Sequence, residues 1–67
     1  MIKYKIDVIE ALKQAGYNTT KIRAEKLIGE RNLTQIRRGE PVSWLVVNRL
    51  CSLLHCQPGD LFIFEED

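Results

Sequence analysis

Side chains that form hydrogen bonds are concentrated between residues 30 and 38. Leu33 and Ile36 in this segment are apolar and three positions apart, which places them on one face of a helix. The opposite face carries side chains that nearly all donate or accept hydrogen bonds: Glu30, Arg31, Thr34, Gln35 and Arg38. Such a helix face is suited to recognise a polar partner by hydrogen bonding.

The distribution of charge points to the same region. The whole chain has a net charge of only +1. Residues 18–40 carry six basic and three acidic side chains, a net charge of +3, whereas residues 57–67 carry four acidic side chains and no basic one. The molecule is therefore polarised, and one face is suited to bind phosphate while the other is not.

Residues that could catalyse a reaction or hold a metal ion are sparse. The sequence has no nucleophile–base pair and no glycine-rich phosphate loop. Cys51, His55 and Cys56 crowd at one helix end, unlike structural zinc ligands, and Cys51 lies on the apolar stripe of its helix. We therefore expect no enzymatic activity, no metal or other cofactor, and no disulfide bond in a reducing cytoplasm.

Two short helices joined by a tight turn are expected to position the polar face. The first spans about residues 20–26, with Thr19 or Asn18 as the N-cap, because either side-chain oxygen can accept a hydrogen bond from the first turn. The second spans about residues 30–38 and is closed by Gly39, which adopts the left-handed conformation without steric cost. This arrangement is the helix-turn-helix layout.

The rest of the chain is expected to form a framework around these two helices. A strand over residues 2–5 comes first and is followed by a helix from Asp7 to Ala15. The side chains of this first segment that face inward are Ile6, Val8, Ile9, Leu12 and Ala15. After the two short helices come a helix from Trp44 to His55 capped by Ser43, a helical turn from Pro58 to Leu61, and a strand over residues 62–64. The two strands are expected to pair, with the lysines of one facing the acids of the other.

The helix over residues 44–55 is apolar around most of its circumference. Its core stripe is predicted to consist of Trp44, Val47, Leu50, Cys51 and Leu54. Three apolar residues lie off this stripe, namely Leu45, Val46 and Leu53, so this helix is either buried on two sides or pairs with another chain. Val46 and Leu53 share a face, which predicts the interface of a homodimer that is firm only when the polar partner is bound; Phe62 or Phe64 of the same chain is the alternative occupant of this face.

The length of 67 residues allows one domain, spanning residues 1–67. No apolar run is long enough to span a membrane, and the first residues lack the apolar segment of a signal peptide. The sequence therefore predicts a cytoplasmic protein without a membrane partner.

A family resemblance follows from two stretches of the sequence. The segment TTKIRAEKLIGERNLTQIRRGEPVS, followed by a helix ending in LLHCQPGDLF, resembles the phage-repressor and Cro-type (XRE-like) helix-turn-helix regulators, and is most similar to a short single-domain branch from bacteria and their mobile elements. The resemblance covers nearly the whole chain and implies an all-α fold, a five-helix repressor-like DNA-binding domain, to which the strand signals add a small two-stranded ribbon. Two positions depart from the family pattern: Leu27 stands where glycine is usual, and Arg23 where a small alanine is usual.

The resemblance implies that the second helix of the motif enters the major groove of double-stranded DNA. The base-reading positions then fall on Glu30, Arg31, Asn32, Thr34 and Gln35. The phosphate-binding positions fall on Thr19, Thr20, Lys21, Arg37, Arg38 and Ser43. Simpler roles stay open for several of them: Arg31 and Arg38 as a solvated helix face, Glu30 as an acid near a helix N-terminus, and Thr19 and Thr20 as capping residues.

The sequence thus favours a transcriptional regulator, a repressor, that binds specific double-stranded DNA sequences. It indicates no small-molecule ligand. The alternative is a protein-interaction module on the same fold, such as an antirepressor or an antitoxin-like partner that uses the apolar helix over residues 44–55.

Overall fold

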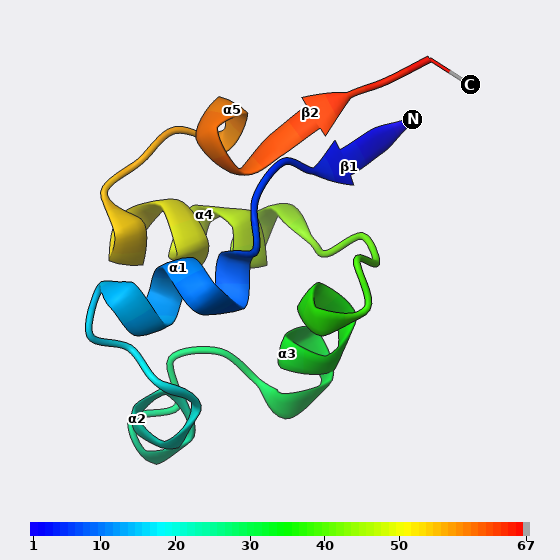
Figure 1. Cartoon of the computed structure of the whole chain (residues 1–67). Helices are drawn as coiled ribbons and strands as arrows, with labels where there is room; N and C mark the ends of the chain where they lie inside the picture. The colour runs from blue at the N-terminus through cyan, green and yellow to red at the C-terminus, as the bar shows by residue number, and fades with distance from the viewer. Residues whose placement is uncertain (67) are drawn as a thin grey trace.

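The chain folds into five helices, and its two ends pair as a ribbon that extends beyond the helices (Figure 1). The structure is a computed structural model that describes residues 1–66. Its elements are β1 (Ile2–Tyr4), α1 (Val8–Gln14), α2 (Thr19–Ala24), α3 (Glu30–Arg37), α4 (Trp44–Leu54), α5 (Pro58–Leu61) and β2 (Phe62–Phe64). The predicted mainly helical fold with a small terminal ribbon is confirmed.

Three of the helices begin at a side chain that caps the first turn. The side-chain oxygens of Asp7, Asn18 and Ser43 accept hydrogen bonds from the N–H groups of Glu10 at 3.1 Å, Lys21 at 2.8 Å and Val46 at 3.3 Å, respectively. Caps of this kind typically stabilise a helix by about 1 kcal/mol each. The cap of α2 is therefore Asn18, and Thr19 is the first helical residue.

The four longer helices end in the same way. A residue with positive φ follows each of them: Gly16 at 94°, Lys26 at 53°, Gly39 at 72° and His55 at 51°. The N–H group of the next residue then bonds to the carbonyl five positions earlier, from Tyr17 to Leu12, Leu27 to Ile22, Glu40 to Gln35 and Cys56 to Cys51. This is the Schellman motif, which satisfies carbonyls that a helix end leaves unpaired.

These helix ends confirm Gly39 as the terminator of α3 and shorten α2 relative to its prediction. Because Lys26 itself takes the left-handed conformation, α2 ends at Ala24 rather than Lys26. Gly29 has an ordinary extended backbone (φ −66°, ψ 155°) as the N-cap of α3. The turn between α2 and α3 therefore does not require a glycine at position 27 or 29.

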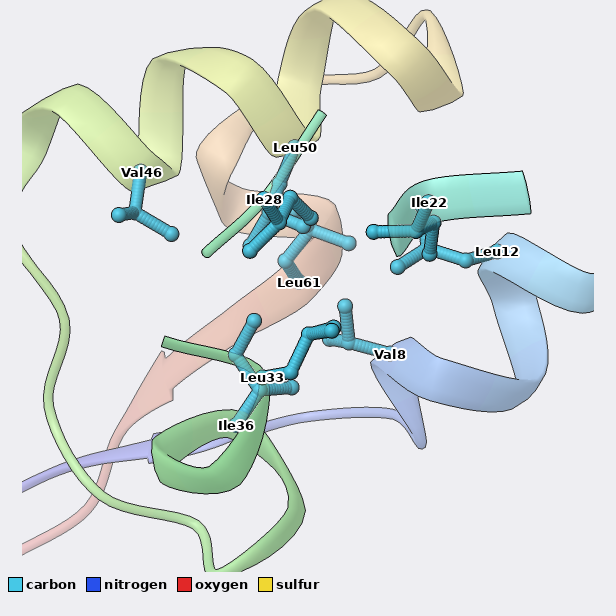
Figure 2. Close-up of a cluster of buried hydrophobic side chains, with 9 residues drawn as sticks. All are labelled: Val8, Leu12, Ile22, Ile28, Leu33, Ile36, Val46, Leu50 and Leu61. Carbon is cyan, nitrogen blue, oxygen red and sulfur yellow. The ribbon is translucent and has the colours of Figure 1, made fainter. Parts of the chain in front are cut away.

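One hydrophobic core joins all five helices (Figure 2). Its buried side chains are Val8 and Leu12 from α1, Ile22 from α2, Ile28 from the turn, Leu33 and Ile36 from α3, Val46 and Leu50 from α4, and Leu61 from α5. Fully burying a side chain of this size contributes about 1.5–3 kcal/mol relative to leaving it exposed. Leu33 and Ile36 therefore fix which face of α3 points to solvent.

The predicted core is wrong at several positions. Trp44 is 79% exposed, and Val46 is buried in its place, so the core face of α4 is rotated from the predicted stripe. Trp44 is the first residue of α4, and its side chain lies outside the core that the helix covers from Val46 onward. Ile6 and Ala15 are exposed because they lie just outside α1, where the helical period no longer places their side chains.

The ribbon pairs β1 with β2 in antiparallel register, with Ile2 opposite Phe64 and Tyr4 opposite Phe62. The Nζ atom of Lys3 lies 3.0 Å from a carboxylate oxygen of Glu65, which confirms the predicted pairing for this lysine, whereas Lys5 forms no ion pair within residues 1–66. The predicted acidic tail also includes Asp67, which lies outside the described residues.

Tyr4 connects the ribbon to the helical body. Its ring packs against Phe62 with 4.9 Å between ring centroids, and its hydroxyl donates a hydrogen bond of 2.9 Å to the carbonyl oxygen of Glu40. Since Glu40 closes the Schellman motif of α3, the ribbon is tied directly to the end of that helix.

Candidate nucleic-acid interface

The outward face of α3 carries a stripe of polar side chains opposite Leu33 and Ile36. The stripe consists of Arg31, Thr34, Gln35 and Arg38, at the i, i+3, i+4 and i+7 spacing that aligns side chains along one face of a helix. Arg31, Thr34 and Arg38 are exposed and Gln35 is half-buried. We call these four residues the α3 polar stripe.

Most donors and acceptors of the α3 polar stripe face solvent. The hydroxyl of Thr34 donates a hydrogen bond of 3.0 Å to the carbonyl of Glu30, so that its oxygen remains available as an acceptor. Arg31 and Arg38 form no ion pair within residues 1–66. The guanidinium groups can therefore bind an external partner without first breaking a salt bridge.

Glu30 and Asn32 flank the stripe rather than lie on it. The carboxylate of Glu30 forms an ion pair with the Nε atom of Arg23 across the turn between α2 and α3. Asn32 is half-buried and lines a shallow hollow of about 110 Å³ together with Leu45 and Arg49. Of the five predicted base-reading residues, the structure thus aligns Arg31, Thr34 and Gln35 on one stripe and places the other two beside it.

Arg23 is a component of this surface that the sequence-based site omitted. The long side chain at this position, where the resemblance leads one to expect alanine, extends to the surface, where it meets Glu30. Both side chains are about half exposed, so the pair contributes little to stability but adds a cation beside the first turn of α3. The departure from the family pattern was the signal that could have identified it.

Arg49 is the second component that was missed. From α4, its Nη1 atom donates a hydrogen bond of 3.1 Å to the carbonyl oxygen of Leu27, which lies 22 residues away in the turn between α2 and α3. Ile28, the next residue, is buried in the core. The turn is therefore held from two sides, and this fixes the direction in which α3 leaves it.

The predicted phosphate-binding residues lie at helix starts and along the exposed surface. The side-chain oxygen of Asn18 accepts a hydrogen bond from the N–H group of Lys21, but the N–H groups of Thr19 and Thr20 have no partner inside the helix. The Nζ atom of Lys21 lies 5.1 Å from the ring centroid of Tyr17. This cation–π contact holds the ammonium group near the start of α2.

Ser43 and the arginines at the end of α3 complete the predicted set. Arg37 and Arg38 are exposed at the last turn of the helix. The hydroxyl oxygen of Ser43 caps α4, which leaves its proton free to be donated. In Figure 1, α2 lies on the side of the molecule away from the ribbon, whereas α3 lies nearer to the ribbon, to which Tyr4 ties its C-terminal end.

The cysteines have a structural explanation at the end of α4. Cys51 and Cys56 occupy the two positions of a Schellman motif whose side chains pack together, and both are free and half-buried. Burial, with a smaller contribution from nearby Cys51, raises the pKa of the Cys56 thiol above its usual range. A raised pKa lowers the fraction of reactive thiolate at neutral pH.

Two further properties hold for residues 1–66. No helix in this range is long and apolar enough to cross a membrane. No cluster of three or more His, Cys, Asp or Glu side chains in the same range could bind a metal ion.

Comparison with known proteins gives one match. The family model for the Cro/C1-type HTH DNA-binding domain matches residues 5–67, nearly the whole chain. No curated protein and no solved structure matches the chain.

Proposed function

Because the chain belongs to the Cro/C1-type helix-turn-helix DNA-binding domain family, we propose that it binds specific double-stranded DNA sequences and acts as a transcriptional repressor. The observation that carries the proposal is the α3 polar stripe, in which Arg31, Thr34, Gln35 and Arg38 face solvent from a helix anchored by Leu33 and Ile36. A helix of this kind fits the major groove, where each base pair presents a distinct pattern of donors and acceptors.

Base recognition is assigned to the first part of the stripe. Arg31 can donate two hydrogen bonds to O6 and N7 of guanine, and Gln35, one turn further along, can pair with N6 and N7 of adenine. Thr34 can contact a neighbouring base through its hydroxyl or its methyl group. Glu30 could accept a hydrogen bond from cytosine N4 while it retains Arg23, and Asn32 lies at the margin of the contact.

Phosphate binding is assigned to the groups around the stripe. Thr19 and Thr20 present backbone N–H groups and hydroxyls at the start of α2, and Lys21 adds a positive charge. Arg37, Arg38 and Ser43 contact the backbone further along the duplex. These contacts set the position of α3 on the DNA without reading its sequence.

Repression follows from occupancy of a site that the transcription machinery needs. The proposed function places the protein in the same compartment as its DNA, the bacterial cytoplasm. One copy offers few base-reading side chains, too few for strong selection across a genome. We therefore propose that two copies bind two half-sites one helical turn apart.

Selection of binding sites from a random duplex library, followed by a salt titration on the selected site, tests this function. A binder with several phosphate contacts should lose affinity steeply with salt, by a slope of about −0.9 per contact on a double logarithmic plot. Lys21→Ala should weaken binding to all sequences alike and flatten that slope by about one. Failure to enrich any sequence, or binding that does not respond to salt, would reject the proposal in favour of a protein-interaction module.

A further inference from the structure

Two free thiols lie close together where α4 ends. Cys51 belongs to the last turn of the helix and Cys56 follows the helix, and both pack half-buried against the core. Packing explains why the two positions are apolar, but it does not require sulfur at either of them, because any apolar side chains can make this contact of a Schellman motif. We call Cys51 and Cys56 the cysteine pair.

The backbone holds the cysteine pair at the spacing of a disulfide. The N–H group of Cys56 donates a hydrogen bond of 3.1 Å to the carbonyl oxygen of Cys51. With standard bond lengths, this contact keeps the two Cα atoms no more than about 7 Å apart, and the bends of the chain at both ends shorten the distance further. Disulfides usually join Cα atoms that are about 4.4–6.8 Å apart. The pair therefore lies within bridging range without a movement of the backbone.

Cys56 is fixed from both sides. Before it, His55 takes the left-handed conformation that closes the Schellman motif. After it, the N–H group of Gln57 donates a hydrogen bond of 2.9 Å to the carboxylate of Asp60 at the start of α5. Burial is the largest cause of the raised pKa of the Cys56 thiol, and the charge and hydrogen bond of the adjacent Cys51 side chain add to it. Two groups held together in this way react as an intramolecular pair, at a high effective concentration.

The surroundings of the cysteine pair favour oxidation over the binding of a metal ion. A structural zinc ion takes four protein ligands. In the part of the chain that the structure describes, no group of three or more His, Cys, Asp or Glu side chains could hold a metal. A dithiol without further ligands can instead close to a disulfide.

We propose that the cysteine pair is a modification site, at which a peroxide oxidises the two thiols to a disulfide within one chain. One sulfur, as the thiolate, attacks the peroxide: an S–O bond forms, the O–O bond breaks, and the departing oxygen takes a proton and leaves as water or an alcohol. The second sulfur attacks the resulting sulfenic acid: an S–S bond forms, the S–O bond breaks, and hydroxide leaves as water with the thiol proton. The pair loses two electrons and one peroxide gains them.

The reduced pair remains the resting form in a reducing cytoplasm, where disulfides are usually transient. The proposal does not depend on the proposed binding of DNA. Because a thiol of high pKa is a poor leaving group, a small thiol that attacks the bridge at Cys51 should displace Cys56 slowly. The oxidised state should therefore outlast the exposure to peroxide.

The bridge should lock the end of α4 while the fold stays the same. It closes a loop over residues 51–56 and so restricts the unfolded chain. For a loop this short, the folding equilibrium constant should rise on the order of tenfold. The Schellman motif can then open only over a narrower range, so hydrogen exchange of the Cys56 amide should slow as well.

A disulfide between two chains is the alternative product, and the dimer surface predicted on α4 does not favour it. Val46 is buried in the core, so the prediction is wrong there, and Leu53 is half-buried. Leu45 is 75% exposed, but it lies near the start of α4, at the opposite end of the helix from the cysteine pair. This surface would not bring the cysteines of two copies together.

Titration of the dilute, reduced protein with hydrogen peroxide tests the proposal. Alkylation of free thiols, followed by mass spectrometry of the intact chain, should show both thiols lost together and a mass lower by two hydrogen atoms. One peroxide should be consumed per chain, and a non-reducing gel should show a monomer. The far-ultraviolet circular dichroism spectrum should stay unchanged, and dithiothreitol should restore both thiols.

An exchange of two neighbouring residues provides the matched control. Cys51→Ser combined with Ser52→Cys keeps the composition but moves one thiol by about 100° around the helix, away from Cys56. In glutathione buffers, closing the bridge in this variant should require an oxidised-to-reduced ratio about 100-fold higher or more, because a misplaced pair strains the disulfide. Circular dichroism checks that the variant folds.

Several results would overturn the proposal. The first is a wild-type chain whose two thiols stay free, react independently to sulfinic or sulfonic acids, or form disulfides only between chains. The second is a bridge that forms only with loss of the helical spectrum. The third is a folded exchange variant that closes as readily as the wild type. The products of the wild-type chain decide the question by themselves if the variant does not fold.

Discussion

Replacing Gly39 by alanine should destabilise the fold by about 1 kcal/mol through the backbone alone. Gly39 has a φ of +72°, and a Cβ atom built on it would meet no atom within 4 Å. Holding a residue with a Cβ atom in this conformation costs about 1–2 kcal/mol, and the reduced freedom of the unfolded chain returns about 0.4–1 kcal/mol of that.

Gly59 provides the matched control for this prediction. A Cβ atom at Gly59 would also meet nothing within 4 Å, but this glycine has no positive φ. Gly59→Ala should therefore leave stability unchanged or raise it by up to about 1 kcal/mol. Urea unfolding monitored by circular dichroism measures the free energy of unfolding of both variants. Thermal unfolding gives a second readout, because for a domain of this size 1 kcal/mol shifts the melting temperature by roughly 4–8 °C. Equal stability of the two variants would refute the assignment of a left-handed terminator to α3.

Two further predictions concern contacts that hold the helix-turn-helix in place. Arg49→Met keeps the aliphatic part of the side chain but cannot donate a hydrogen bond to the Leu27 carbonyl. It should lower the free energy of unfolding in urea by about 0.5–1.5 kcal/mol and also weaken DNA binding. Unchanged values for both would show that the contact does not fix the turn. Tyr4→Phe should cost a similar amount, about 0.5–1.5 kcal/mol, because the ring still packs on Phe62 while the bond to Glu40 is lost. Burial raises the pKa of Tyr4 above 10.0, so the folded chain retains the hydroxyl proton to higher pH than the unfolded chain does. The stability that the protonated Tyr4 contributes should therefore be lost as the pH rises above about 10. Tyr4→Phe should show a weaker pH dependence in that range, and an identical one would exclude Tyr4 as its source.

Much of the fold could be predicted because the signals for it are local. Asp7, Asn18 and Ser43 cap helices at the positions where such residues usually do, and Gly16 and Gly39 end helices by a conformation that glycine adopts freely. The ribbon followed from the alternation of apolar and basic residues at the start of the chain and from the apolar run of residues 62–64 near its end. The stripe opposite Leu33 and Ile36 followed from helical periodicity alone.

The parts that could not be predicted depend on contacts between distant residues or on the end of an element. Lys26 takes a conformation for which its residue type gives no signal, so the end of α2 was misplaced. Trp44 has the residue type of a core side chain, and only the packing of α4 shows that it lies outside the core. The bond from Arg49 to Leu27 joins residues 22 positions apart, which no local pattern indicates.

The base preference of variants at Arg31 tests most directly whether α3 reads bases through this side chain. The measurement is the dissociation constant of the selected DNA site and of its single-base variants for the wild-type chain, Arg31→Lys and Arg31→Ala. The lysine variant keeps the charge but loses the planar fork that guanine recognition needs. Both variants should lose about 1–3 kcal/mol on the selected site and relax the preference at one base position, while Arg31→Lys keeps the salt dependence of the wild type. An unchanged preference at every base position in both variants would contradict the assignment of α3 to the major groove.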